Sequence, residues 1–174
     1  MRKAFLVIMA TLANIAATIA QNDSQTGYNF LRLPISAHAA ALGGDNISVI
    51  DDDEALMFSN PALLSSVTDK SLNLNYMSYM QGSKVASAAF NKTFGERATA
   101  AVSASYIDYG KMKETDESNM QTGEFSAKDI SIAGYFSYLL TDRLSGGVSA
   151  KFITSYIADY NSIAVGVDLG LNYY

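Results

Sequence analysis

The sequence contains no cysteine and no tryptophan, two prolines and a single histidine. The absence of cysteine excludes a disulfide scaffold, a cysteine-ligated zinc site and thiol catalysis. His38 has no second histidine with which to form a metal site, and we expect it to be a packed residue of an alanine-rich segment. No Ser/His/Asp constellation and no phosphate-binding glycine loop is apparent. We therefore interpret the chain as a non-enzyme without cofactor or metal.

The first twenty residues have the three parts of a secretory signal peptide. Arg2 and Lys3 provide the positive start, residues 4–12 are apolar, and small residues at 18 and 20 precede a cleavage point at Gln21. The apolar run is short for a spanning helix, so an anchor helix is the less favoured alternative. With no cysteine at the cleavage point, the exported protein is not a bacterial lipoprotein of the usual kind.

Cleavage there would leave ten basic and seventeen acidic residues, a formal charge of −7. This balance argues against a nucleic-acid partner. Eleven tyrosines and eight phenylalanines, among many small residues, are typical of strands that face two different solvents.

Apolar and polar residues alternate with a period of two from residue 71 onward. The pattern predicts six strands, at residues 71–80, 84–94, 98–108, 129–140, 143–156 and 162–174. They are as long as tilted membrane strands, and Ser, Thr, Asn and Gly lie opposite the apolar residues. The expected fold class is all-β, an antiparallel transmembrane β-barrel; a soluble β-sandwich is the alternative.

The connections between these strands alternate in length. Residues 95–97 and 141–143 are expected to be tight turns, whereas 109–128 is expected to be a long polar loop and 157–161 a shorter one. Periplasmic turns and outer loops alternate in this way. Aromatic residues are expected at the two membrane interfaces: Tyr79, Tyr106 and Tyr156 at one end, Phe94, Tyr138 and Tyr173 at the other. On the polar face, Lys151 and Asp168 are expected to form an ion pair.

Residues 21–70 have no sustained period and form a separate segment. Asn60 is a good helix N-cap and Pro61 suits the first helical position, so the pair predicts a tight turn that starts a short helix. The acidic run 51–54 lacks the spaced ligands and central glycine of a calcium loop. We expect it to be a solvated turn that caps the residues after it.

Two blocks of this segment resemble a known family. Asn60-Pro61-Ala62-Leu63, just ahead of the first strand, is similar to the hatch motif of the FadL-like superfamily of outer-membrane barrels. The block at residues 30–44, which ends in Gly43-Gly44, more closely resembles the PorQ family, relatives of PorV in the type IX secretion system of Bacteroidota. The resemblance implies that residues 21–70 form a plug and that residues 71–174 begin a barrel. Its plug motif comprises Gly43, Gly44, Asn60, Pro61, Ala62 and Leu63.

Six strands depart from this family, because a membrane barrel needs roughly eight strands to close. The resemblance therefore implies a partial barrel. The chain would be the first part of a longer protein, which we favour, a truncated product, or one of several copies that assemble.

The function implied by the resemblance is that of an outer-membrane component of protein secretion. It would contact outer-membrane lipid and anchor a surface or periplasmic protein that attaches cargo at the cell surface. The residues expected to contact this partner lie in the long loop: Lys111, Lys113, Glu114, Asp116, Glu117 and Glu124. The alternative is a FadL-like transporter of hydrophobic small molecules. The polar face favours the scaffold, because it consists mostly of Ser, Thr, Asn and Gly, with Met77, Tyr79, Tyr135 and Ile153 as exceptions.

Overall fold

The structure is a computed structural model that describes residues 28–174 except 45, 80–81, 117 and 119. The chain divides into two compact units, Met1–Leu31 and Arg32–Tyr174. In the first, the rings of Tyr28 and Phe30 meet edge to face, with centroids 6.5 Å apart, at the start of the 3-10 helix η2 (Asn29–Arg32). The expected signal peptide, residues 1–20, lies outside the described residues.

Three short helices open the second unit: α2 (Ala37–Ala41), η3 (Glu54–Phe58) and η4 (Pro61–Ser66). Each has a side-chain cap, from Ser36, Asp53 and Asn60 respectively, that accepts a hydrogen bond from a backbone N–H of the first turn. The prediction that Asn60 and Pro61 start a short helix is confirmed. These three helices and their connections, residues 33–71, are called the helical segment below.

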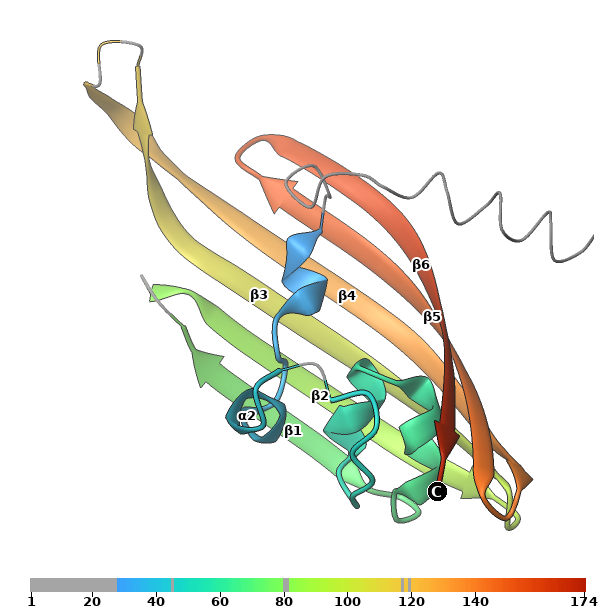
Figure 1. The fold of residues 1–174 in the computed structure, drawn as a ribbon. Helices are drawn as coiled ribbons and strands as arrows, with labels where there is room; N and C mark the ends of the chain where they lie inside the picture. Colours follow the sequence, from blue (N-terminus) through green and yellow to red (C-terminus); the bar gives the residue numbers. More distant parts are fainter. Residues whose placement is uncertain (1–27, 45, 80–81, 117, 119) are drawn as a thin grey trace, which may run out of the picture. The chain divides into compact units, whose positions relative to one another are not determined.

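Six strands follow: β1 (Leu72–Ser78), β2 (Lys84–Phe94), β3 (Ala98–Thr115), β4 (Gln121–Thr141), β5 (Leu144–Ile157) and β6 (Tyr160–Tyr173). They form one antiparallel sheet in the order of the sequence (Figure 1). The sheet is open, because within the described residues β1 and β6 each pair on one side only. The all-β, antiparallel part of the prediction is thus confirmed.

Three predicted boundaries are wrong. Residues 109–128 are mostly strand, because β3 and β4 stay paired up to Thr115 and Gln121, across a bulge between Asp108 and Lys111. Residues 157–161 are not a loop either, because only Ala158 and Asp159 separate β5 from β6. β1 has seven residues where ten were expected. In contrast, β2 has the predicted bounds, 84–94.

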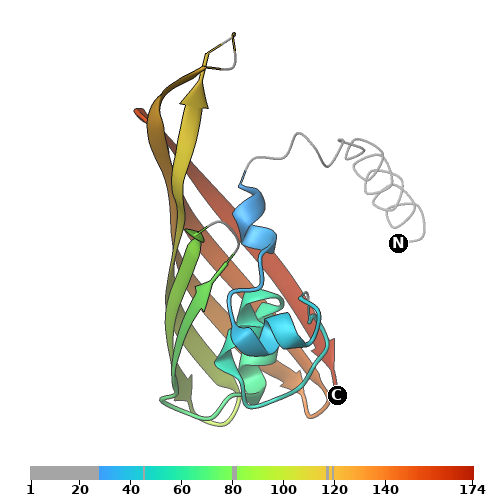
Figure 2. The ribbon, with the colours of Figure 1, turned by 90° about the vertical axis from the view of Figure 1, so that its left-hand side faces the viewer.

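The helical segment lies on one face of the curved sheet (Figure 2). That face carries the polar residues of the alternating pattern, and several of its serines are fully buried beneath the helices, among them Ser137 and Ser145. The opposite face carries the apolar residues and is open, with Val165 exposed to 74% and Leu169 to 83%. The two faces of the sheet therefore have the reverse of the polarity that a soluble two-layer domain requires.

The core lies between the helical segment and the polar face. Met57, Leu64 and Val67 pack there against small residues of the strands, Ala89, Ala101 and Ala133, and against Tyr135. The ring of Phe58 meets that of Tyr135 edge to face, with centroids 6.0 Å apart. Helices can approach the sheet closely because the strands present alanine and serine where they cross.

Candidate functional site

The Asn60-Pro61-Ala62 turn is seated on the last three strands of the sheet. Its helix, η4, contacts β4, β5 and β6, which come from the other end of the chain (Figure 1). The side-chain oxygen of Asn60 caps η4 by accepting from the Ala62 N–H at 3.0 Å. The turn is thus both a helix start and the place where the helical segment meets the sheet.

Two paired glycines receive the turn. Gly147 of β5 and Gly170 of β6 are direct partners across the strands. A Cβ at Gly147 would overlap the Pro61 carbonyl carbon and the Ala62 nitrogen, and a Cβ at Gly170 would overlap the side-chain oxygen of Asn60. Only glycine allows so close an approach of two backbones.

Hydrogen bonds complete this contact. The Asn60 side-chain nitrogen donates to the carbonyl oxygens of Ile47 at 2.7 Å and Leu171 at 3.2 Å. The hydroxyls of Ser137 and Ser145 both donate to the Ala62 carbonyl, at 3.2 and 3.1 Å. The Asn60 side chain and the Ala62 N–H and carbonyl are therefore hydrogen-bonded, as polar groups buried in a protein usually are.

The Leu171 carbonyl belongs to the open edge of the sheet. The Tyr174 N–H, just after β6, donates to the carbonyl of Arg143, just before β5. Because every second residue of an antiparallel strand bonds to the same neighbour, the even-numbered residues of β6 hydrogen-bond to β5. The N–H and C=O groups of odd-numbered residues, Leu171 included, then point away from β5. Asn60 thus satisfies one carbonyl of a row that has no strand partner in the described residues.

The plug motif is only partly brought together. Ala62 and Leu63 are buried with the turn. Gly43 and Gly44 lie after α2, where positive φ angles of 95° and 108° require glycine, and no atom would contact their Cβ positions. Asn46 links them to the turn, because its side chain donates to the Gly44 carbonyl at 2.7 Å and the next residue, Ile47, accepts from Asn60.

His38 is not the packed residue that was expected. Its side chain is 41% exposed, and its Nδ1 lies 2.7 Å from a carboxylate oxygen of Asp53. The other Asp53 oxygen accepts from the Ala55 N–H at 2.9 Å and the Asn73 side chain at 3.1 Å. Asp53 therefore connects α2, η3 and β1.

The acidic run is solvated only in part. Asp51 and Asp52 are exposed, and hydrogen bonds from the Thr68 hydroxyl and N–H hold the pKa of Asp52 below its usual value. Glu54, in contrast, is 1% exposed and neither carboxylate oxygen has a hydrogen-bond partner. Burial, with the neighbouring Asp53 charge, raises the pKa of Glu54 to about 7. The backbone of Asn73 lowers the pKa of Glu54 by less than burial raises it.

The described members of the expected partner-contact set lie at the far end of the sheet from the turn, in the extended β3–β4 hairpin (Figure 1). Lys111, which is 80% exposed, pairs with Glu124 at 3.1 Å. Lys113 and Glu114 are exposed, and Asp116 shapes the tip by accepting from the N–H groups of Ser118 and Met120. Glu117 lies outside the described residues.

The predicted ion pair on the polar face is confirmed. Lys151 Nζ lies 2.6 Å from Asp168 Oδ2, which also accepts from the Ser149 hydroxyl at 2.7 Å. The pair joins β5 to β6 next to the glycines that receive the turn.

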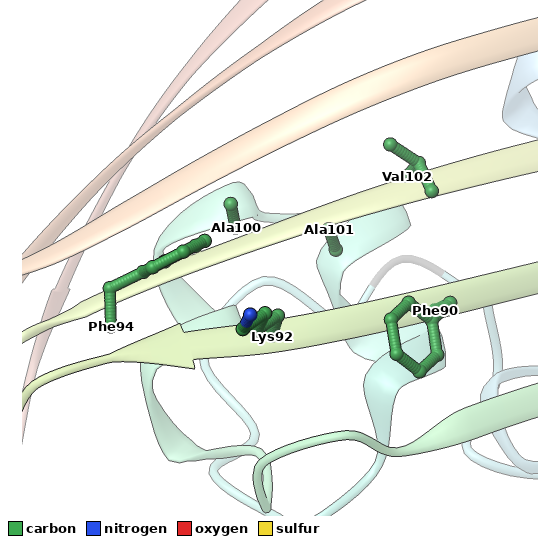
Figure 3. Close-up of a pocket in the computed structure, with 6 residues that line it drawn as sticks. All are labelled: Phe90, Lys92, Phe94, Ala100, Ala101 and Val102. Carbon is green, nitrogen blue, oxygen red and sulfur yellow. The ribbon is translucent and has the colours of Figure 1, made fainter.

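The outer apolar face forms five consecutive rows of residues paired across the strands. The second row from the hairpin end consists of Leu74, Ala88, Ala104, Ile132, Phe152 and Val165. Figure 3 shows a shallow hollow over the next three rows, where Phe90, Lys92 and Phe94 of β2 lie beside Ala100 and Val102 of β3. The Lys92 ammonium lies 5.4 Å from the Phe94 ring centroid, as expected for a lysine that extends along an apolar surface.

The glycine pair was missed by sequence reasoning. A usable signal existed, since Gly147 and Gly170 both fall on the polar face of neighbouring strands. Their pairing and their contact with a turn 86 and 110 residues away, respectively, could not be read from that pattern.

No known protein family and no curated protein matches this chain. Within the described part of the chain, no helix is both long and apolar enough to cross a membrane. The same residues contain no group of three or more His, Cys, Asp or Glu side chains that could hold a metal ion.

Proposed function

We propose that the protein is part of an outer-membrane β-barrel whose helical segment lies in the lumen as a plug. The observation that carries this proposal is the outer face of five apolar rows. Five rows of about 6.7 Å occupy roughly 33 Å along the strands, or roughly 25 Å across a membrane at a tilt of about 40°. A band of about 25 Å is what lipid-facing barrel surfaces present.

The polar face supports the same assignment. Its serines and its Lys151–Asp168 pair would line a barrel interior, and the helical segment already covers several of the serines. Closure would require further strands beside β1 and β6, from a longer chain or from other copies. We favour the longer chain, of which these strands are the first part.

Lipid contact can be tested by single cysteines, because the chain has none of its own. Val165 and Gly166 are adjacent on β6 and face opposite sides; a Cβ at Gly166 would meet only ordinary contact, 3.8 Å from Lys151. Nitroxide labels are attached to Val165→Cys and Gly166→Cys of the natural protein in its membrane, and the collision rates of each label with oxygen and with a polar nickel complex are compared. The label at 165 should collide with oxygen and that at 166 with a polar nickel complex. Equal polar accessibility at both sites would contradict a membrane-facing sheet.

We further propose that the barrel serves type IX protein secretion by anchoring a partner that attaches cargo at the cell surface. The support is the resemblance of residues 30–44 to the PorQ family and of Asn60–Leu63 to the hatch motif of the FadL-like superfamily, together with the exposed hairpin. The hairpin continues past the last rows of the sheet and carries charges of both signs, so it is the surface best placed to recognise a protein.

Removal of the hairpin tests this role. Asp108 and Lys128 are the last β3–β4 partners before the bulge, so a short turn containing Asn-Gly can replace residues 109–127 and keep the strand pairing below it. The shortened protein should remain in the outer membrane and should no longer retain the partner in a pull-down. Lys113→Gln/Glu114→Gln, which keeps the hairpin and its net charge, shows whether these charges carry the contact. Full retention of the partner by the shortened protein would exclude the hairpin as the anchor.

A FadL-like transporter of hydrophobic small molecules is the alternative. It needs an apolar lumenal pocket, yet Tyr135, one of the large side chains of the polar face, is 4% exposed and packed against Phe58. The packing therefore favours a scaffold. Binding of a long-chain fatty acid by the intact protein, lost in Met77→Ala and Tyr135→Ala, would reverse this order.

A further inference from the structure

A row of polar residues borders the apolar face at its hairpin end. Lys84 of β2, Asp108 of β3, Lys128 of β4 and Tyr156 of β5 are consecutive partners across the strands. All four side chains lie on the apolar side of the sheet, and the first apolar row below them contains Tyr106. With neighbouring strands about 4.8 Å apart, the two lysines are roughly 10 Å apart along the row.

These lysines have no acidic partner within the part of the chain that the structure describes. Asp108 lies between them, but its Oδ1 accepts from the Gly110 N–H at 2.9 Å, and no ion pair joins it to either lysine. Lys111 and Lys151, by contrast, are paired with Glu124 and Asp168. Lys84 and Lys128 are exposed, so their ammonium groups are available to an external anion.

We propose that Lys84 and Lys128 bind the phosphate groups of glycolipid headgroups in the leaflet at the hairpin end. This inference rests on the proposed membrane location, which places the row at the depth of the headgroups. Lysine binds phosphate as a compact point charge, and basic residues at a membrane surface attract anionic headgroups. The two unpaired lysines stand out in a chain of net charge −5, so they do not simply reflect an overall positive charge.

The leaflet follows from the connections of the strands. The hairpin end holds the long β3–β4 extension, whereas the opposite end holds short turns at residues 95–97 and 142–143. In outer-membrane barrels the long connections face outside. The outer leaflet of that membrane consists largely of phosphorylated glycolipid, and Tyr106 and Tyr156 would lie beside its sugars at the interface.

The test uses the natural protein isolated in mild detergent from its cell envelope. Glycolipid that copurifies is measured as 3-hydroxy fatty acid per mole of protein, for the wild type and for Lys84→Gln/Lys128→Gln. Bound glycolipid should fall about tenfold in the double variant, since two surface lysines are lost. The matched control, Lys92→Gln/Arg97→Gln, removes the same charge at the opposite end and should bind as the wild type does.

Membrane insertion is measured separately, as resistance to extraction by alkaline carbonate. Extraction of the wild-type protein would overturn the proposed function itself. An inserted wild type with no bound glycolipid, or with the same amount as Lys84→Gln/Lys128→Gln, would overturn only the inference. An equal loss in the control variant would also overturn it, because the effect would then be one of overall charge.

Discussion

Gly147 and Gly170 show, at the scale of single residues, how the helical segment is held. Each lacks a side chain at the point where the backbone or side chain of the Asn60-Pro61-Ala62 turn comes closest to the sheet. Gly166 lies on the same face of β6, four residues before Gly170, and a Cβ there would make only an ordinary contact. Glycine is therefore required at 147 and 170 because a side chain has no room there, whereas at 166 a small side chain would fit.

Alanine at Gly147 should displace the turn, whereas alanine at Gly166 should not. The added methyl group at 147 has no room, and overpacking of this kind costs about 1–3 kcal/mol. Gly166→Ala should change stability by less than about 1 kcal/mol, and in the stabilising direction. Hydrogen exchange of the amides of residues 60–67 measures the effect. Equal protection in both variants would show that the turn is not seated on the glycine pair.

Glu54 makes the stability of the helical segment depend on pH. Its pKa is raised to about 7 from an ordinary value of 4.5. Between these values the folded protein keeps a proton that the unfolded chain has released, so stability should fall as pH rises through this window and level off above it. The expected loss is roughly 1–3 kcal/mol after allowance for screening.

Urea midpoints at pH 4.5 and pH 8, read by limited proteolysis of residues 33–71, measure this loss. Glu54→Gln should abolish most of the difference between the two pH values, because the amide does not titrate. Asp51→Asn, an exposed neighbour, should keep it. A Glu54→Gln protein with the wild-type pH dependence would assign the effect to another group.

At the scale of elements, Asn60 has two separable roles. Its oxygen caps η4, and its nitrogen donates to a carbonyl of the connection before η3 and to one of β6. Asn60→Asp keeps the cap and loses both donations, whereas Asn60→Ala loses all three bonds. Loss of the cap alone costs about 1 kcal/mol.

If the donations dominate, Asn60→Asp should destabilise the helical segment at least as much as Asn60→Ala, because a carboxylate would then face two carbonyl oxygens. If the cap dominates, Asn60→Asp should resemble the wild type. Urea unfolding of the two variants side by side distinguishes the cases. We expect the first result, with a loss of roughly 2–3 kcal/mol.

The strands were predictable where one face of the sheet is apolar and the other polar. β2 and most of β5 and β6 show that contrast, and their positions follow from it. The far part of the β3–β4 hairpin is mostly exposed, with only Met112, Gly123 and Phe125 partly buried, so its sequence is largely polar and was taken for a loop. The cap at Asn60 was predictable because it is local. Its bond to Leu171, 111 residues away, was not.

At the scale of the whole molecule, the decisive feature is the pair of open edges. The odd-numbered N–H and C=O groups of β6 point away from β5, and β1 is likewise paired on one side only. Such edges pair with other chains unless they are covered. Residues 21–174 refolded alone in detergent should therefore give heterogeneous oligomers.

Proline on the open edge tests this explanation. Val167 directs its N–H away from β5, so Val167→Pro removes an edge donor and leaves the β5–β6 hydrogen bonds in place. Residues 21–174 with this substitution should shift toward smaller species in size-exclusion chromatography. Asp168→Pro, one residue further on, breaks a hydrogen bond to β5 and should not. A monodisperse, heat-modifiable monomer from unsubstituted residues 21–174 would contradict the open-edge account and favour a self-contained sheet.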